Sequence, residues 1–319
     1  MQKSLSIIVP IYNGAGTIKA LVIDLKKELF PLFELEIVLV NDGSFDDSAN
    51  ICSEISEKDA TVKFIDLSRN FGEHNAVMAG LNFCTGDVAV IIDDDFQNPP
   101  SEIIKLIDEM NKGYDVVYSY YTKKEHSYLR NLGSKFNNKV ATILIGKPSE
   151  LYLSSFKAVS RFIIDELIKY TGPYSYIDGI IFRITRRYST VLVHHNPRQT
   201  GKSGYTMYKL IVLWLNMFTN FSILPLRITM ITGFMFAFAG FIGAIAFFIE
   251  RIQNSDLPLG WASVIISLFI ISGVQLLGLG MIGEYLGRMF MSDNGKPQFV
   301  VRKAVNCEGQ IKDAKLSNK

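Results

Sequence analysis

The stretch Val88-Ala-Val-Ile-Ile-Asp-Asp-Asp-Phe-Gln-Asn-Pro-Pro100 is the most informative part of the chain. Its apolar first half has the length of a buried strand, and this strand is expected to end at three carboxylates. Open α/β sheets bind ligands beyond the carboxyl ends of their strands. Asp93, Asp95 and Gln97 offer the oxygen ligands that Mg²⁺ and Mn²⁺ favour. A solvated acidic turn is the alternative, so the flanking sequence must decide between the two.

The flanking sequence repeats a strand-then-helix pattern. This alternation predicts an α/β domain with a Rossmann-like, mostly parallel sheet that is covered by helices on both faces. The expected strands cover residues 5–10, 36–40, 62–66, 88–92 and 115–119, and the expected helices cover residues 17–30, 46 onward, 73–84 and 103–111.

Polar residues follow each of the first four expected strands. Any one of these ends is explained by ordinary turn chemistry, because Asn, Asp and Gly are common in turns. Four polar ends that converge on one edge of a sheet instead indicate a ligand site. Besides the Asp93–Gln97 segment, the candidate residues at this edge are Pro10, Tyr12, Asn13, Asp42, Ser44 and Arg69.

Two further segments carry basic residues. Arg130 and Ser134 are four apart and would share one face of a helix, although an exposed basic helix is the simpler interpretation. Arg198 and Lys202 lie in a glycine-containing loop that suits phosphate binding. The His194–His195 pair, placed on a strand, would point to opposite faces, which argues against a shared metal site. The net charge of only +2 gives no argument for nucleic acid as a partner.

The C-terminal third contains two uncharged runs, Ile228–Ile249 and Trp261–Ile282, each long enough to cross a bilayer. An aromatic segment, 208–222, precedes them and is typical of a helix in the membrane interface. Arg227 lies before the first run and Arg288 after the second. The positive-inside rule then predicts a multi-pass protein of the cell inner membrane, with the α/β domain and both termini in the cytoplasm.

These observations divide the chain into four predicted parts. Residues 1–204 form the α/β domain, residues 205–227 interfacial amphipathic helices, residues 228–287 a two-helix transmembrane hairpin, and residues 288–319 a cytoplasmic tail. The tail begins with a strand-like segment, 298–303. Glycines in the second run permit close helix packing, which makes a homo-oligomer through the transmembrane helices a candidate assembly.

The strand-end motifs resemble those of family-2 glycosyltransferases with the GT-A fold. The C-terminal motifs are similar to those of the membrane-bound polyprenyl-phosphate glycosyltransferases, which include bactoprenol glucosyltransferases, dolichyl-phosphate mannose synthases and undecaprenyl-phosphate aminoarabinose transferases. The resemblance covers nearly the whole chain and rests on Val9–Asn13, Val40–Ser44, Ser68–Gly72, Asp93–Pro100, Pro225–Arg227 and Gly283–Arg288.

The resemblance implies an inverting transfer of a sugar from a nucleotide sugar to undecaprenyl phosphate or another polyprenyl phosphate. A UDP-sugar such as UDP-glucose is the expected donor, the cytoplasmic membrane face the expected location, and modification of cell-envelope glycans the expected role. A flippase is a candidate partner for the product. Asp42, Ser44, Arg69 and the Pro10–Asn13 turn are expected to bind the donor, with its base and ribose at Asp42 and the turn.

The resemblance also assigns the reacting end of the site. Asp93, Asp95 and Gln97 would hold Mg²⁺ or Mn²⁺ against the donor diphosphate, where negative charge grows during transfer. Asp94 is expected to point away if the strand continues through it. The candidates for binding the lipid phosphate or the diphosphate are Arg130, Ser134, Arg198 and Lys202.

The general base is not assigned by the resemblance. Relatives carry an Asp shortly before a Phe-Arg pair, whereas here Ser154 and Ser155 precede Phe156–Lys157. Glu150 and Asp178 are therefore alternative candidates. A phosphate acceptor, whose second pKa is about 6, needs positioning more than deprotonation. Two other functions stay open, namely a processive polysaccharide synthase and a non-catalytic membrane scaffold that binds nucleotide sugar.

Overall fold

The structure is a computed structural model of the 319-residue chain. It describes residues 4–121, 142, 148, 151–173, 175–196, 224–253, 260–294 and 297–307. The chain forms two compact units. The first unit combines Met1–Tyr205 with Lys296–Lys319, and the second unit is Thr206–Gly295.

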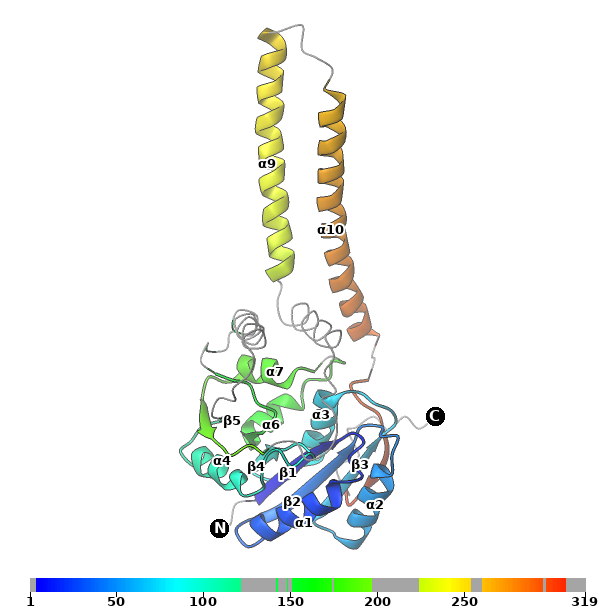
Figure 1. Cartoon of the computed structure of the whole chain (residues 1–319), viewed down its shortest axis with the longest axis vertical. Coiled ribbons are helices and arrows are strands. Elements are labelled where there is room, and N and C mark those ends of the chain that lie inside the picture. Colours follow the sequence, from blue (N-terminus) through cyan, green and yellow to red (C-terminus); the bar gives the residue numbers. More distant parts are fainter. Residues whose placement is uncertain are drawn as a thin grey trace. The chain divides into compact units, whose positions relative to one another are not determined.

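The first unit is built on one sheet, which has eight strands in the described residues and the order β7-β5-β6-β4-β1-β2-β3-β8 (Figure 1). β1 pairs in parallel with β2 and β4, and β2 pairs in parallel with β3. β6 runs antiparallel between β4 and β5, while β7 lies parallel to β5. The sheet is therefore mostly parallel, as the sequence predicts. The strands are β1 (Ser4–Ile11), β2 (Glu34–Asn41), β3 (Val62–Leu67), β4 (Val88–Ile91), β5 (Val116–Tyr120), β6 (Lys157–Ser160), β7 (Tyr188–Leu192) and β8 (Val301–Val305).

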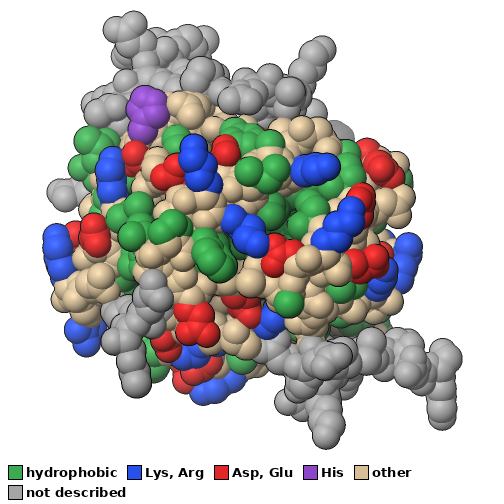
Figure 2. Space-filling model, turned by 90° about the horizontal axis from the view of Figure 1, so that it is seen from below, with side chains coloured by type: hydrophobic (Ala, Val, Ile, Leu, Met, Phe, Trp, Pro, Cys, Tyr) green, Lys and Arg blue, Asp and Glu red, His purple; other side chains and the backbone are tan. Residues whose placement is uncertain are grey.

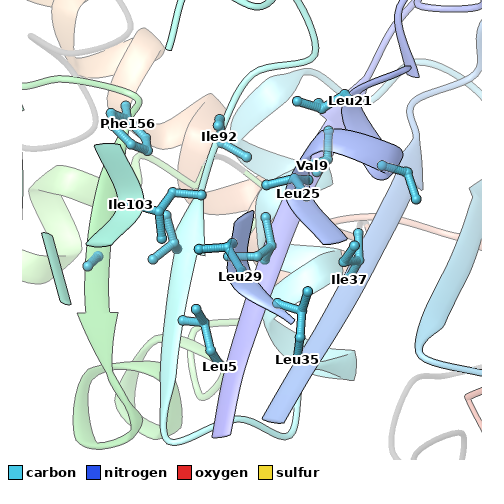
Figure 3. Close-up of a cluster of buried hydrophobic side chains, with 14 of the residues drawn as sticks. Leu5, Val9, Leu21, Leu25, Leu29, Leu35, Ile37, Ile92, Ile103 and Phe156 are labelled. Atoms are coloured by element: carbon cyan, nitrogen blue, oxygen red, sulfur yellow. The ribbon is translucent and has the colours of Figure 1, made fainter. Parts of the chain in front are cut away.

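Helices cover both faces of this sheet. On one face, α1 (Ile18–Leu29), α2 (Ser48–Lys58) and α4 (Glu102–Met110) pack against alternate strand residues in a single apolar cluster (Figure 3). The strand residues of this cluster include Leu5, Val9 and Ile37, which follow the period of two that a strand imposes. This alternation explains why the apolar runs of the sequence predict the strands correctly.

The opposite face carries α3 (Glu73–Phe83), α6 (Arg161–Leu167) and α7 (Ile177–Ile184). α3 contacts β1, β2 and β3. A Cβ at Gly80 would lie 2.5 Å from Ile8 Cγ2, so this glycine lets α3 approach the sheet closely. The position of α3 matters for function, because its first turn lies at the carboxyl ends of the strands.

β8 comes from the C-terminal segment and closes one edge of the sheet. It pairs antiparallel with β3, with Phe64 opposite Val305. The Asn306 side chain then donates to the carbonyls of Ser56 and Val62, at 2.6 and 2.8 Å. The strand-like start of the predicted tail is therefore part of the α/β sheet.

The second unit contains two long helices in contact, α9 (Leu224–Gln253) and α10 (Trp261–Asp293) (Figure 1). Within α10, Ile270–Gly287 is long and apolar enough to cross a membrane, and none of this stretch is buried within the described structure. The apolar stretch found in α9, Thr229–Gly243, is shorter. One of the two predicted spans is thus supported by length and composition, and the second stays a prediction.

The surface of the first unit that Figure 2 displays carries acidic and basic side chains interspersed. No single sign of charge dominates this face, which agrees with the net charge of +2. Electrostatic binding of nucleic acid needs a basic stripe or patch. The view therefore adds no support for a nucleic-acid partner.

Candidate active site

The loops after β1 and β2 are locked together by reciprocal hydrogen bonds. The Asn13 N–H donates to Ser44 Oγ at 2.9 Å, and the Phe45 N–H donates to Asn13 Oδ1 at 2.9 Å. Gly43 has φ +63°, and a Cβ there would lie 2.4 Å from the carbonyl carbon of Arg69. Three strand-end loops thus touch at backbone distance, and the sequence-predicted residues on them are brought together.

Replacement of Gly43 by Ala should lower the free energy of unfolding by about 1–3 kcal/mol, because a left-handed backbone and a backbone clash both oppose the new methyl group. Denaturant unfolding followed by circular dichroism measures this change. Gly16→Ala is the matched control, since nothing lies within 4 Å of its Cβ position. Equal stability of the two variants would show that the β2 and β3 loops do not touch as described.

Asp42 ties the β2 loop to the start of α3. Its buried carboxylate accepts the N–H groups of Phe71 and Gly72 at 2.7 and 2.9 Å. Desolvation is the larger effect and raises the pKa of Asp42 despite these two bonds. The Arg69 guanidinium stacks 4.5 Å from the centre of the Phe71 ring. Tyr12, on the neighbouring loop, is exposed and therefore accessible to a ligand.

The triple-Asp segment is a turn rather than a strand. β4 ends at Ile91, and Phe96 has φ +59°, so the chain bends sharply within the segment. The alternation expected to turn Asp94 away therefore does not apply. The Asp94 carboxylate packs on the β1 loop, where a Cβ on Gly14 would lie 2.0 Å from Asp94 Oδ2. Asp95 is buried, and its Oδ1 accepts the N–H of Gln97 at 3.1 Å.

Strand register places Ser155 beside Asp93. Ile91 of β4 pairs with Lys157 of the antiparallel β6. Residues just before Lys157 therefore lie next to residues just after Ile91. Ser155 Oγ accordingly donates to Asp93 Oδ2 at 2.7 Å. A neutral hydroxyl therefore stands just before Phe156, where the resemblance predicts a carboxylate, and it orients Asp93.

A buried ion pair lies behind this contact. The Lys157 ammonium contacts Asp178 Oδ1, and both side chains are almost fully buried. The Tyr118 hydroxyl donates to the same oxygen at 3.0 Å. Tyr118 is the residue opposite Lys157 in the β5–β6 register. Asp178, a candidate base from the sequence, is thus engaged by two donors inside the protein.

Glu73 and His74, at the start of α3, are functional candidates that the sequence does not single out. Desolvation raises the pKa of Glu73 to about 7, with further contributions from the charges of Asp93, Asp178 and Asp95. Its side chain is nevertheless accessible to solvent. An acid in the first turn of a helix is common, because it complements the helix dipole. Nothing in the sequence distinguishes Glu73 from such an acid that only complements the helix dipole.

A model of the family described as "Glycosyl transferase family 2" matches residues 6–168, which is half of the chain and contains all four strand-end motifs. The chain belongs to glycosyl transferase family 2. The resemblance predicted from the motifs is confirmed, and the protein is a glycosyltransferase.

Similar proteins extend the comparison over nearly the whole glycosyltransferase. It is 34% identical, over 95% of its own length and 91% of the relative's, to an undecaprenyl-phosphate 4-deoxy-4-formamido-L-arabinose transferase of Pseudomonas fluorescens strain Pf-5. The transferase of that name from Yersinia enterocolitica is 31% identical over 96% and 95% of the two chains. These matches agree with the predicted subgroup of polyprenyl-phosphate enzymes.

The solved structure of glucosyl-3-phosphoglycerate synthase from Mycobacterium tuberculosis, in complex with Mn²⁺ and UDP-glucose, has a similar fold. It is 16% identical with a TM-score of 0.51 and covers 67% of this glycosyltransferase and 79% of its own chain. At this identity the likeness concerns the fold, which supports the predicted GT-A-like sheet.

A second polar network, formed by residues that follow β5 and β7, holds the segment after the triple-Asp turn of the glycosyltransferase. The Tyr121 hydroxyl donates to Asn98 Oδ1 at 3.0 Å, and the ring of His195 lies 4.2 Å from that of Tyr121. The Asn196 N–H donates to the Gln97 carbonyl at 2.8 Å. β7 ends at Leu192, so the histidines follow the strand rather than alternate on it. His195 is involved in holding the turn.

His74 predicts a pH dependence of stability. Desolvation lowers its pKa to about 4, with Lys157 acting in the same direction and Asp178 against it. The unfolded value is about 6.5, so the unfolded chain binds a proton first as pH falls. The stability that this group contributes is present above about pH 6.5 and is lost toward pH 4.

His74→Gln should therefore flatten the decline of the unfolding temperature between pH 6.5 and 4, as measured by thermal scans in detergent. His194→Gln, which changes an exposed side chain, is the control and should leave the decline intact. Identical pH profiles for wild type and His74→Gln would contradict the assignment.

Several predicted site residues fall outside the described part of the chain. They are Arg130, Ser134, Glu150, Arg198 and Lys202. Within the described residues, no three His, Cys, Asp or Glu side chains are grouped to hold a metal ion by themselves. The roles of Asp93, Asp95 and Gln97 as ligands stay a prediction, in which a donor diphosphate completes the shell.

Proposed function

We propose that this glycosyltransferase moves a sugar from a UDP-sugar to undecaprenyl phosphate at the cytoplasmic membrane face, with inversion at the anomeric carbon. The observation that carries the proposal is the 34% identity, over 95% of the chain, to an enzyme named as an undecaprenyl-phosphate sugar transferase. Undecaprenyl phosphate resides in a bilayer, and the apolar stretch of α10 is long enough to enter one.

The strand-end edge is the proposed donor site. Asp42, Ser44, Arg69 and the Pro10–Asn13 turn belong to three loops that touch one another, which suits a ligand that spans them. Asp93 and Asp95 add negative charge and oxygen donors at the end of β4. This donor set fits Mg²⁺ or Mn²⁺ shared with a diphosphate. Such an ion, when bound, neutralises the charge that develops on the leaving diphosphate.

In the proposed reaction, an acceptor phosphate oxygen attacks C1 of the sugar. The bond between C1 and the diphosphate oxygen breaks, and UDP leaves with the electron pair. A phosphate monoester is largely ionised near neutral pH, so no strong base is needed. The ion pair with Lys157 supports a structural role for Asp178 rather than a proton-accepting one. Glu150 stays a candidate base. The residues proposed to hold the acceptor phosphate or the donor diphosphate are Arg130, Ser134, Arg198 and Lys202.

The membrane arrangement is proposed as follows. α9 and α10 both span the inner membrane, and the catalytic unit lies in the cytoplasm, as the positive-inside rule predicts. The glycines of α10 permit a homo-oligomer. A flippase would then carry the lipid-linked sugar to the other face, where cell-envelope glycans are modified.

The deciding experiment combines purified protein in detergent with undecaprenyl phosphate, Mn²⁺ or Mg²⁺, and a panel of UDP-sugars. The panel contains UDP-glucose, UDP-galactose, UDP-N-acetylglucosamine and UDP-4-deoxy-4-formamido-L-arabinose. Mass spectrometry of the lipid fraction should find one sugar per lipid phosphate, formed only with metal present. Folded protein that makes no lipid-linked sugar from any donor would refute the proposal.

The same experiment separates the two alternatives. A processive polysaccharide synthase would give lipid or free products that carry several sugars. A membrane scaffold would bind UDP-sugar, measured by calorimetry, without product. The scaffold stays an alternative because Ser155, a neutral residue, stands where the resemblance predicts a catalytic carboxylate.

A further inference from the structure

The two serines that precede β6 are directed to different partners. Ser154 is buried, and its hydroxyl lies 2.8 Å from the Ser119 hydroxyl and accepts the N–H of Phe156 at 3.2 Å. Ser155 is half-buried, and its hydroxyl donates to Asp93 Oδ2 at 2.7 Å. The first serine therefore holds the interior beside β5, whereas the second faces the end of β4, where the proposed donor site lies.

The contact between Ser155 and Asp93 is set by the sheet. β4 and β6 pair up to Ile91 and Lys157. Asp93 lies two residues beyond the first of these, and Ser155 lies two residues before the second. The N–H of Ile92 donates to a carbonyl of β1 at 3.0 Å, so the chain is tied to the sheet up to the residue before Asp93. The hydroxyl therefore meets the carboxylate from a rigid support.

The two proposed acidic ligands are held in different ways. Asp95 accepts the N–H of Gln97 at 3.1 Å, a bond within its own turn. Asp93 accepts from Ser155, which is 62 residues away in the chain. The orientation of Asp93 can therefore be changed through Ser155 while the local hydrogen bond of Asp95 is kept.

A hydroxyl suits the task of orienting a carboxylate that binds metal. It donates one hydrogen bond and brings no charge of its own. A Lys or Arg at the same place would compete with a divalent cation for the carboxylate, because it would neutralise the charge that attracts the ion. Carboxylates that bind metal are usually hydrogen-bonded in turn, and loss of such a partner typically costs 10- to 100-fold in metal affinity or activity.

We propose that Ser155 is a positioning residue of the metal site, whose hydroxyl holds the Asp93 carboxylate in place for the divalent ion and so raises the affinity for Mn²⁺ or Mg²⁺. The inference rests on the proposed function and adds to it a residue that lies outside the strand-end motifs. It also gives a role to the neutral side chain that stands where the resemblance predicts a carboxylate.

The test measures the binding of Mn²⁺ to the full-length protein in detergent with UDP present, by electron paramagnetic resonance of the unbound ion. Ser155→Ala should raise the Kd for Mn²⁺ by about tenfold or more, because the carboxylate loses its hydrogen-bond donor. Ser155→Thr keeps a hydroxyl on the same carbon and should retain most of the affinity.

Ser189→Ala is the matched control. The Ser189 hydroxyl also donates to a carboxylate, Glu109 Oε1 at 2.8 Å, and this bond is partly buried as well. Ser189 lies near the amino end of β7, whereas the proposed site is at the carboxyl ends of the strands. Its replacement should leave the Kd for Mn²⁺ unchanged.

A double-variant cycle shows whether Ser155 acts through Asp93. Asp93→Ala should itself weaken Mn²⁺ binding, and the addition of Ser155→Ala should weaken it little further, because the partner of the hydroxyl is already gone. Losses that add in full would overturn the inference. Equal affinities of wild type and Ser155→Ala, or a Thr variant as weak as the Ala variant, would also overturn it and leave the proposed function standing.

The assay for lipid-linked sugar is independent of these binding measurements. A wild-type protein that binds Mn²⁺ with UDP but makes no lipid-linked sugar would refute the proposed function, and the affinities of the variants would still decide the inference. A wild-type protein that transfers sugar but binds no Mn²⁺ with UDP would overturn the inference.

Discussion

Replacement of Asp95 by Ala or Asn should lower kcat for glycosyl transfer by about 10²- to 10³-fold, the range found when one group that stabilises developing charge is removed. Asp95 is buried at the end of β4, and its carboxylate is one of the two proposed acidic ligands of the metal. Asn keeps the acceptor for the Gln97 N–H and removes only the charge. Turnover of lipid-linked product, measured over a range of Mn²⁺ concentrations, gives the result.

Asp108→Ala is the control for Asp95→Ala, because Asp108 is an exposed acid on α4. It should keep wild-type turnover. The two Asp95 variants should also require more Mn²⁺ for the activity that remains. Wild-type turnover in Asp95→Asn with an unchanged Mn²⁺ requirement would remove Asp95 from the proposed metal site.

Replacement of Lys157 by Met should lower the free energy of unfolding of the catalytic unit by about 3–5 kcal/mol, the cost of leaving one charge of a buried pair without its partner. Lys157 and Asp178 are both almost completely buried. The Tyr118 hydroxyl would remain as a neutral donor to Asp178 and would compensate only part of the loss. Denaturant unfolding followed by circular dichroism measures the change.

The double variant Lys157→Met with Asp178→Asn should recover much of that stability, because no isolated charge remains. Lys58→Met is the control, since its partner Glu54 is exposed and exposed ion pairs contribute little to stability. A Lys157→Met protein as stable as Lys58→Met would show that the buried pair does not form.

The strands and helices of the N-terminal half follow from the sequence because burial imposes simple periods. Leu5, Ile7 and Val9 face one cluster, while Ile8 faces α3. The expected bounds of β1 to β5 fall close to those observed. The sequence also predicts that the loops after β1, β2 and β3 lie together, because parallel strands bring their carboxyl ends to one edge of the sheet.

The remaining features depend on contacts between segments that are distant in the chain. Ser155 meets Asp93 only because β6 is antiparallel to β4, and the sequence does not encode that direction locally. The alternation of a strand does not place Asp94, because β4 stops at Ile91, before the triple-Asp segment. Glu73 looks like an ordinary first-turn acid until its neighbours Asp93 and Asp178 are known.

β8 has a consequence for how the protein is made. The edge strand that pairs with β3 is synthesised after the whole of Thr206–Gly295. At about 5–20 residues per second, the ribosome needs roughly 5–20 s for this segment alone, and the β3 edge stays open for at least that time. An open edge is a template for pairing with another chain. Expression of residues 1–205 alone would make this exposure permanent, so a soluble catalytic fragment should carry the segment 296–307 joined by a linker.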